Sequence, residues 1–237
     1  FYLPLLHRLS SGEWFTSRTS AALLFASVYE KIPLSMRADV HSMFVSLCTD
    51  ETPMVRRAAA RDMSALVKRM SPEVVINEML PLYRRLSADD QDSVRLLTVQ
   101  NLVAMAKVLS PAETQQLLLS SICGAFQDKS WRVRYMAADN FVQLATAVGE
   151  EVVKEDLVPA YINMMRDAEA EVRTAAATQA PGLAKLLDQN TIIERLLPVA
   201  KELADDPSQH VRGALAAQVS ALAPLLGKDA TTEHLLP

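Results

Sequence analysis

The sequence predicts an all-α fold, an α-solenoid of about six stacked repeats with two helices in each and a period of 39 residues. The first observation behind this prediction is an arginine that recurs at intervals of 38 or 39 residues. The second is a proline on the same period, and the third is an apolar stripe with helical spacing that follows each arginine. A fixed period near 40 residues is typical of helical-repeat proteins, in which each repeat packs on its neighbours.

The period makes the chain, 1–237, a single domain. The predicted repeats cover approximately 1–33, 34–72, 73–111, 112–150, 151–189 and 190–227, and 228–237 begins a further repeat. Both ends fall at the proline position of a first helix, and neither end has the polar capping repeat that a solenoid needs. We therefore expect an internal piece of a longer solenoid.

The first helix of each repeat is expected to bend at the recurring proline. This position holds Pro4, Pro81, Pro159, Pro198 and Pro237, with Ser42 and Ser120 in the two remaining places. Apolar residues surround each proline, which indicates a helix interior. A proline there removes one backbone hydrogen bond and kinks the helix.

A short polar turn follows, and it carries an aspartate six residues before the arginine. The pairs are Asp50 and Arg56, Asp89 and Arg95, Asp128 and Arg134, Asp167 and Arg173, and Asp206 and Arg212. The aspartate can accept hydrogen bonds from amides of the second helix, and the arginine can reach carboxylates of the same or the next repeat. We call these ten residues the ladder and expect them to be structural, since the pairing recurs with fixed spacing. The alternative is a row of arginines that binds phosphate or acidic peptides.

The first repeat departs from this pattern. Its arginine is Arg18, but Gly12 replaces the aspartate and Ser17 replaces the valine that precedes the other arginines. The ladder is therefore expected to be weakest there.

The second helix carries the apolar stripe four, seven and ten residues after each arginine. These positions hold Ala22, Ala60, Val99, Ala138, Ala177 and Ala216; Phe25, Met63, Leu102, Phe141, Ala180 and Val219; and Val28, Leu66, Met105, Leu144, Leu183 and Leu222. This spacing places all three positions on one face of a helix, which predicts the core. Between repeats, Pro33, Pro72, Pro111, Gly149 and Gly227 are expected to end the second helices.

The turn before each second helix holds large apolar residues where other repeats are polar. Two residues before the valine the repeats hold, in order, Phe15, Pro53, Asp92, Trp131, Ala170 and Gln209. A position that accepts Asp and Gln is not a core position, so we expect Phe15 and Trp131 to be exposed, together with Trp14 and Met54 at neighbouring positions. Exposed Trp, Met and Arg side chains are typical of protein-binding surfaces. The alternative is that each packs against the next repeat.

Charged residues lie along the same turns. Arg57 and Arg132 could anchor a partner, although a solvated role is as good an interpretation for either one. The acidic residues of this edge favour a partner with basic patches. They are Glu51, Asp90, Asp92, Glu169 and Glu171.

Several classes of function are not indicated. The net charge of −4 and the pI near 5.6 argue against nucleic acid as the main partner. No apolar run approaches the ~20 residues of a membrane span. Phosphate-loop, nucleophile-elbow, Cys-x-x-Cys and His-Glu-x-x-His motifs are missing, and the four histidines are dispersed, so we expect no enzyme, metal or cofactor. Cys48 and Cys123 are expected to be free, buried thiols in a reducing compartment.

The repeat unit resembles the HEAT repeat, through its Asp-x4-Val-Arg turn, its Leu-Pro in the first helix and its length. Segments 13–20, 52–60, 90–97, 128–136, 169–173 and 226–229 also closely resemble the 65-kDa scaffold subunits of protein phosphatase 2A. Because the likeness includes turn residues that the general repeat does not require, it is specific.

This resemblance implies a non-enzymatic scaffold in the cytoplasm and nucleus. Regulatory B subunits would bind the turns, and the catalytic subunit would bind repeats beyond Pro237. We call the implied contact residues the turn ridge: Trp14, Phe15, Thr52, Pro53, Met54, Arg57, Asp92, Ser130, Trp131, Arg132 and Glu171. The alternative is a nuclear-transport receptor, or another protein-binding solenoid, built from the same repeats.

Overall fold

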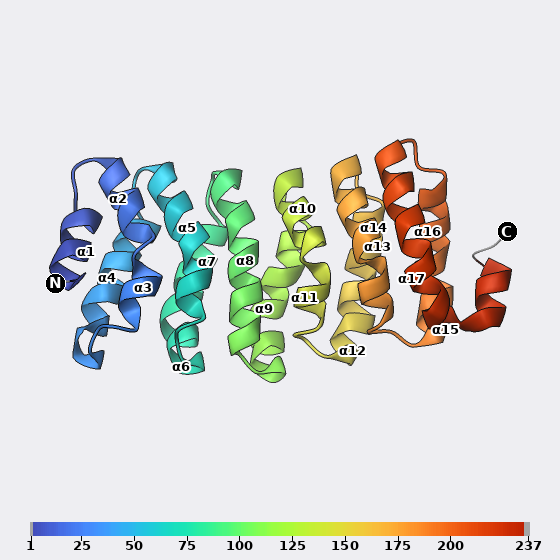
Figure 1. The fold of residues 1–237 in the computed structure, drawn as a ribbon, viewed down its shortest axis with the longest axis horizontal. Helices are drawn as coiled ribbons and strands as arrows, with labels where there is room; N and C mark the ends of the chain where they lie inside the picture. The colour runs from blue at the N-terminus through green and yellow to red at the C-terminus, as the bar shows by residue number, and fades with distance from the viewer. Residues whose placement is uncertain (1, 235–237) are drawn as a thin grey trace. The chain divides into compact units, whose positions relative to one another are not determined.

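The computed structural model describes residues 2–234, so Pro237, the last recurring proline, lies outside the described residues. Within that range the fold is all-α, with no strand, and it is the α-solenoid that the period predicts (Figure 1). The chain divides into two compact units, Phe1–Ser110 and Pro111–Pro237. Each unit is described by itself.

The first unit contains three helical repeats. The first helix is α1 (Tyr2–Ser10) in the first repeat and α4 (Arg37–Cys48) in the second, where a 3₁₀ turn, η1 (Leu34–Met36), precedes it. In the third repeat the first helix begins as α6 (Pro72–Val74) and continues through η2 (Val75–Met79) into α7 (Leu80–Ser87). The second helices are α2 (Phe15–Ala22) with α3 (Phe25–Tyr29), α5 (Pro53–Val67) and α8 (Asp92–Val108). The first helices pack on one another in chain order, and so do the second helices. The unit therefore has two helical layers.

The second unit repeats this arrangement. Its first helices are α9 (Pro111–Phe126), α12 (Glu150–Val152) with η3 (Val153–Leu157) and α13 (Val158–Met165), and α15 (Gln189–Thr191) with η4 (Ile192–Leu196) and α16 (Leu197–Ala204). Its second helices are α10 (Trp131–Asp139) with α11 (Phe141–Ala145), α14 (Ala170–Ala184) and α17 (Gln209–His234). Helix α14 packs between α10 and α17.

The recurring proline interrupts the first helix by a π-helical turn. The turns η2, η3 and η4 each end directly before the Leu or Val that precedes Pro81, Pro159 or Pro198. Proline has no backbone N–H to donate one turn back, so the helix widens locally, as is common at such sites. Where Ser42 or Ser120 replaces the proline, α4 and α9 run without a π turn. The predicted loss of regular α-helical hydrogen bonding at the prolines is seen in these three repeats as a π turn, and the predicted bend stays a prediction.

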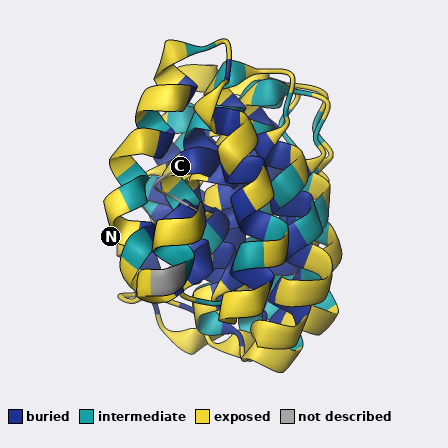
Figure 2. Ribbon diagram, turned by 90° about the vertical axis from the view of Figure 1, so that its right-hand side faces the viewer, coloured by how far each residue is buried: buried dark blue, intermediate teal, exposed yellow. Residues whose placement is uncertain are grey.

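The core lies between the two helical layers of each unit (Figure 2). The predicted stripe of the second helices is buried in the first five repeats. It is wrong for part of α17, where Ala216 is exposed and Val219 is half-buried.

Pro33, Pro72, Pro111 and Gly149 each lie a few residues beyond the end of a second helix, as predicted, whereas Gly227 lies inside α17 and interrupts it with a non-helical conformation. Gly149 and Gly227 have φ of 88° and 77°, a left-handed conformation that favours glycine. Two interruptions were not predicted. The second helix of the first repeat breaks between α2 and α3, and that of the fourth repeat breaks at Asn140, whose side chain donates to the Met136 carbonyl at 2.8 Å.

Candidate protein-binding site

Each ladder arginine lies at the fourth residue of a second helix, and in Arg56, Arg134 and Arg173 the guanidinium reaches two turns at once. Arg56 donates from Nη1 to the backbone carbonyls of Asp50 and Glu51 at 2.8 and 3.2 Å, within its own turn. From Nε and Nη2 it donates to both carboxylate oxygens of Asp89 at 2.5 and 3.1 Å, in the next turn. The arginine thus fixes its own turn and joins it to the following repeat.

The same bidentate pair recurs within both units. The pairs are Arg18 with Asp50, Arg56 with Asp89, Arg134 with Asp167, and Arg173 with Asp206. Their side chains are only 6% to 18% exposed. Arg95 and Arg212 make the carbonyl bonds of their own turns as well. The arginines therefore pair with the carboxylate of the next repeat and not with that of their own.

The ladder aspartates also shape the turn. In each one Oδ1 accepts from the backbone amide two residues later, at 2.8 to 3.0 Å; these amides belong to Thr52, Gln91, Ser130, Glu169 and Ser208. We expected amides inside the second helix, and the structure corrects this: the amide belongs to the residue that precedes the helix. In the paired aspartates the same oxygen also accepts from the arginine of the preceding repeat.

These contacts change the acidity of the carboxylates. For Asp89, burial opposes ionisation, but hydrogen bonds from Arg56 and the Gln91 amide outweigh burial and lower its pKa. The same balance lowers the pKa of Asp50 and Asp167. For Asp206 the hydrogen bond from Arg173 is the largest cause of its lowered pKa. The paired aspartates are therefore held in the charged form.

The first repeat keeps the arginine half of this geometry without an aspartate. Arg18 donates from Nη1 to the carbonyls of Gly12 and Glu13 at 2.9 and 2.8 Å. Ser17 donates to the Leu9 carbonyl at 3.0 Å, and a Cβ on Gly12 would lie 2.5 Å from the Ser17 hydroxyl oxygen. Gly12 and Ser17 therefore fit together, and any larger residue at position 12 requires Ser17 to move.

In the first unit, the predicted ridge residues lie at the first turns of the second helices. Trp14, Phe15 and Met54 are 72%, 43% and 50% exposed, as large apolar side chains rarely are. Pro53 and Arg57 are exposed as well. Thr52 and Asp92 are half-buried. The turns that the Arg–Asp pairs hold together thus expose apolar side chains.

In the second unit, the ridge residues are less exposed than expected. Trp131 was expected to be exposed, and the structure corrects this, since its side chain is half-buried. The Arg132 guanidinium lies 5.3 Å from the Trp131 ring centroid and covers part of it. Tyr135, which the sequence reasoning missed, lies one turn further along α10 and is 37% exposed. Ser130 is half-buried, and Glu171 is exposed at the start of α14.

A groove of about 280 Å³ lies beside the exposed residues of the first unit. Its lining residues are Phe15, Thr19, Ser20, Leu23, Met54, Arg57, Ala58, Arg61 and Leu97. The sequence reasoning missed Leu23, which is 58% exposed. The signal was available, since the corresponding position holds Arg61, Gln100, Asp139, Thr178 and Ala217 in the other repeats. Because four of these five residues are polar, a leucine at this position is expected to be exposed.

Other candidate chemistry is sparse in the described residues. No group of three or more His, Cys, Asp or Glu side chains among them could hold a metal ion. None of the helices described is long and apolar enough to span a membrane. Both cysteines are free, but only Cys48 is buried as expected, and its burial raises its thiol pKa; Cys123 is half-buried.

Comparison with protein families identifies the repeats. Residues 150–227 match a family described as PPP2R1A-like HEAT repeat, and residues 118–148 match the HEAT repeat. The second match covers the turn with Trp131, and the first covers two complete turns of the ladder, with Asp167, Arg173, Asp206 and Arg212.

Curated relatives point the same way. Over 82 residues the chain is 45% identical to the protein phosphatase 2A scaffold subunit of Dictyostelium discoideum. It is 47% identical over 75 residues to a probable serine/threonine-protein phosphatase PP2A regulatory subunit of Caenorhabditis elegans. It is 48% identical over 71 residues to the serine/threonine-protein phosphatase PP2A 65 kDa regulatory subunit of Drosophila melanogaster. These alignments cover 35%, 32% and 30% of this chain and only 14%, 13% and 12% of the relatives.

Solved structures agree on the fold. Cex1p matches the whole chain with a TM-score of 0.72 at 17% identity, over 45% of its own length. Kap121p matches 99% of the chain with a TM-score of 0.73 at 16% identity, over 24% of its length. A designed armadillo repeat protein matches 94% of the chain with a TM-score of 0.61 at 17% identity, over 99% of its length. At these identities the likeness establishes the fold alone.

Proposed function

The chain belongs to the HEAT-repeat proteins, with repeats of the protein phosphatase 2A scaffold type, and on this premise we propose that it is a non-catalytic scaffold whose turn ridge binds regulatory B subunits. The observation that supports this proposal best is the exposure of Trp14, Phe15 and Met54 on turns that the Arg–Asp pairs hold rigid. Rigid, exposed aromatic and methionine side chains bind partners with little loss of conformational entropy.

The proposed mechanism is geometric. A scaffold that holds a catalytic subunit together with a regulatory one raises the effective concentration of each for the other. In this proposal the catalytic subunit binds repeats beyond Pro237. The exposed acidic residues of the turns, among them Glu51 and Glu171, complement basic patches on the regulatory partner. The proposal includes a cytoplasmic and nuclear location, which microscopy of the fluorescently tagged protein tests.

The test is a binding titration with two purified partners. The chain is immobilised after circular dichroism has verified its fold, and a regulatory B subunit of phosphatase 2A is titrated against it. The catalytic subunit is titrated in a separate experiment. We expect the regulatory subunit to bind, whereas the isolated catalytic subunit should not. Binding of the isolated catalytic subunit would overturn the division of partners, and a folded chain that binds neither would overturn the proposed function.

A further inference from the structure

Ser71 is an exposed serine in the loop that leads from the second repeat to the third. It directly precedes Pro72, and the exposed cations Lys68 and Arg69 lie three and two residues before it. Its backbone is extended, with φ −74° and ψ 156°, as a following proline favours. Its side chain makes no capping hydrogen bond with the first turn of α6. Proline-directed protein kinases act on serines of this kind, which directly precede a proline and have a free hydroxyl.

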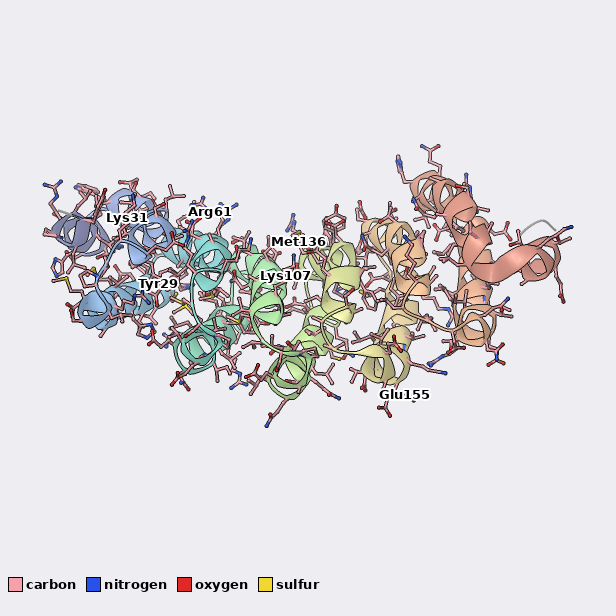
Figure 3. All side chains as sticks on the ribbon, turned by 60° about the horizontal axis from the view of Figure 1, so that its bottom comes forward. Tyr29, Lys31, Arg61, Lys107, Met136 and Glu155 are labelled. Atoms are coloured by element: carbon pink, nitrogen blue, oxygen red, sulfur yellow. The ribbon has the colours of Figure 1, made fainter. Side chains whose placement is uncertain are left out.

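Arg37, at the start of α4, lies in the helix that precedes this loop in the stack of first helices. It is half-buried and forms no ion pair with a described residue of the first unit, and its buried Nε has no hydrogen-bond partner there. Its guanidinium carbon lies 4.5 Å from the ring centroid of Tyr29, which Figure 3 labels. One turn further along α4, Nδ1 of His41 lies 3.0 Å from Oε2 of Glu78 in η2, so α4 runs beside the first helix of the third repeat. A half-buried guanidinium in this place is suited to bind an anion on that helix.

The second unit contains a charged form of the same arrangement. Asp188 lies three periods after Ser71, and Lys154 lies three periods after Arg37. The Asp188 carboxylate accepts from the amide of Thr191 at 2.9 Å and from its hydroxyl at 2.7 Å, and Lys154 Nζ lies 3.1 Å from its Oδ2. These bonds, that from the Thr191 amide above all, lower the pKa of Asp188, so its carboxylate stays charged. A negative group at this loop position is thus bound by its own repeat and by a cation of the preceding repeat.

A cation is not a general feature of the repeat at the Arg37 position. The loop position holds Ser71, Ser110, Gly149, Asp188 and Gly227, and the position in the preceding first helix holds, in the same order, Arg37, Ile76, Gln115, Lys154 and Ile193. The lysine therefore accompanies the aspartate, and the two glycines accompany uncharged residues. Because isoleucine and glutamine also serve the fold at this position, packing of the repeat does not explain Arg37.

We propose that Ser71 is a phosphorylation site whose phosphate is bound by Arg37. A proline-directed protein kinase transfers the γ-phosphoryl group of ATP to Ser71 Oγ: the Oγ–P bond forms, the bond between the γ-phosphorus and the bridging oxygen breaks, ADP leaves and the hydroxyl proton is released. The product carries a charge of about −1.5 to −2 at pH 7 and accepts hydrogen bonds through three oxygens. It accepts from the Val74 amide, at the position of Thr191, and from the Arg37 guanidinium. Phosphorylation thereby joins the second repeat to the third.

Thermal melts of the chain with phosphoserine incorporated at position 71 during translation test this contact. Phosphoserine should raise the melting temperature by about 2–4 °C, the shift expected for one added charge-assisted contact in a chain of this size. In the Arg37→Gln background the phosphate should give no rise. The rise is measured within each background, so the effect of Arg37→Gln by itself cancels. Hydrogen exchange should also slow in peptides from α4 and α6 of the phosphorylated chain, and only when Arg37 is present.

Phosphoserine at position 110 is the matched control. Ser110 is exposed and also precedes a proline, but the aligned residue of the preceding first helix is Ile76. A phosphate there should give no rise that depends on Arg37. If phosphoserine 71 leaves the melting temperature unchanged, or raises it equally in Arg37→Gln, then Arg37 does not bind the phosphate and the proposal is wrong.

Incubation of the folded chain with a purified cyclin-dependent kinase and ATP tests whether Ser71 can be modified. Mass spectrometry locates the phosphate, a synthetic peptide of residues 64–76 is the positive control, and Ser71→Ala is the negative control. We expect phosphate on Ser71 in both the peptide and the folded chain. Phosphate on the peptide alone would show that the fold shields Ser71, and phosphate on neither would show that this kinase class does not recognise it. Either result would overturn the site.

Discussion

Asp89 shows how one side chain can hold two repeats. Its carboxylate accepts from Arg56 of the preceding repeat and from the Gln91 amide of its own turn, while Arg95 binds its backbone carbonyl. Three parts of the chain therefore meet at one residue that is 6% exposed at its side chain. An ion pair this shielded from water costs most when one partner alone is removed, since the other charge is left without compensation.

Asp89→Ala should therefore destabilise the first unit by about 2–4 kcal/mol, because it leaves the Arg56 guanidinium partly buried and unpaired. Urea unfolding followed by circular dichroism measures this change. Asp90→Ala is the matched control, since Asp90 is exposed, and it should stay within about 0.5 kcal/mol of the wild type. Equal midpoints for the two variants would contradict a structural role for the pair.

The same pairs predict a dependence of stability on pH. The pKa values of Asp50, Asp89, Asp167 and Asp206 are lowered in the folded chain, so the folded state binds protons less readily than the unfolded chain. Their contribution is present above the ordinary pKa of about 3.9 and is lost as the pH falls through the folded values. Thermal melts from neutral to acidic pH should show the melting temperature falling below about pH 4. Asp206→Asn should flatten this decline, and an identical decline would contradict the mechanism.

At the scale of the helix, the prolines distinguish two kinds of first helix. The helices with Pro81, Pro159 or Pro198 contain a π turn, and those with Ser42 or Ser120 at the same position do not. The chain thus provides its own comparison, in which one missing N–H changes the local hydrogen-bond pattern. We infer that the π turn follows from the proline and is not required by the packing of the repeat.

Pro159→Ala should then convert η3 to regular α-helix. The new amide at position 159 can donate to the Glu155 carbonyl one turn back, so it should exchange slowly with solvent deuterium. Stability should change by no more than about 1 kcal/mol, because the new hydrogen bond is offset by repacking. Rapid exchange at residue 159, comparable with that of a helix end, would show that neighbouring helices impose the π turn. Gly124→Ala, in the uninterrupted α9 with open space around its Cβ position, is the control.

The helices and the core could largely be predicted from the sequence, because periodicity fixes which face is buried. The interruption at Asn140 could not, because there the side-chain amide and the backbone amide both donate to the Met136 carbonyl, a contact that the spacing of apolar residues does not reveal. The groove was missed for a different reason. Its residues come from the second helices of three repeats, α2, α5 and α8. Aligning the repeats compares residues at equivalent positions, so it does not reveal which residues of different repeats are neighbours in space.

At the scale of the whole molecule, the Arg–Asp pairs are alike from repeat to repeat, whereas the exposed side chains of the turns differ. The Arg–Asp pairs have nearly the same geometry in both units. The turns that they hold differ: Trp14 is 72% exposed in the first unit, whereas Trp131 of the second unit is half-buried with Arg132 over its ring. A uniform frame with variable turns is suited to binding partners that are not themselves repetitive. It also means that each turn must be tested separately.

Substitution of the two tryptophans separates binding from stability. Trp14→Ala removes a side chain with few contacts, so it should weaken binding of the regulatory subunit by more than about 1 kcal/mol and leave the melting temperature unchanged. Trp131→Ala should weaken binding by a similar amount but also lower the melting temperature, because the indole is half-buried and part of its surface is covered by Arg132. Calorimetric titration and thermal melts on the same samples measure both quantities. The control is Gln209→Ala, an exposed residue at the corresponding turn of α17, which should change neither. If Trp14→Ala melts earlier while binding is unchanged, Trp14 belongs to the packing of its turn, and the ridge does not extend to the first repeat.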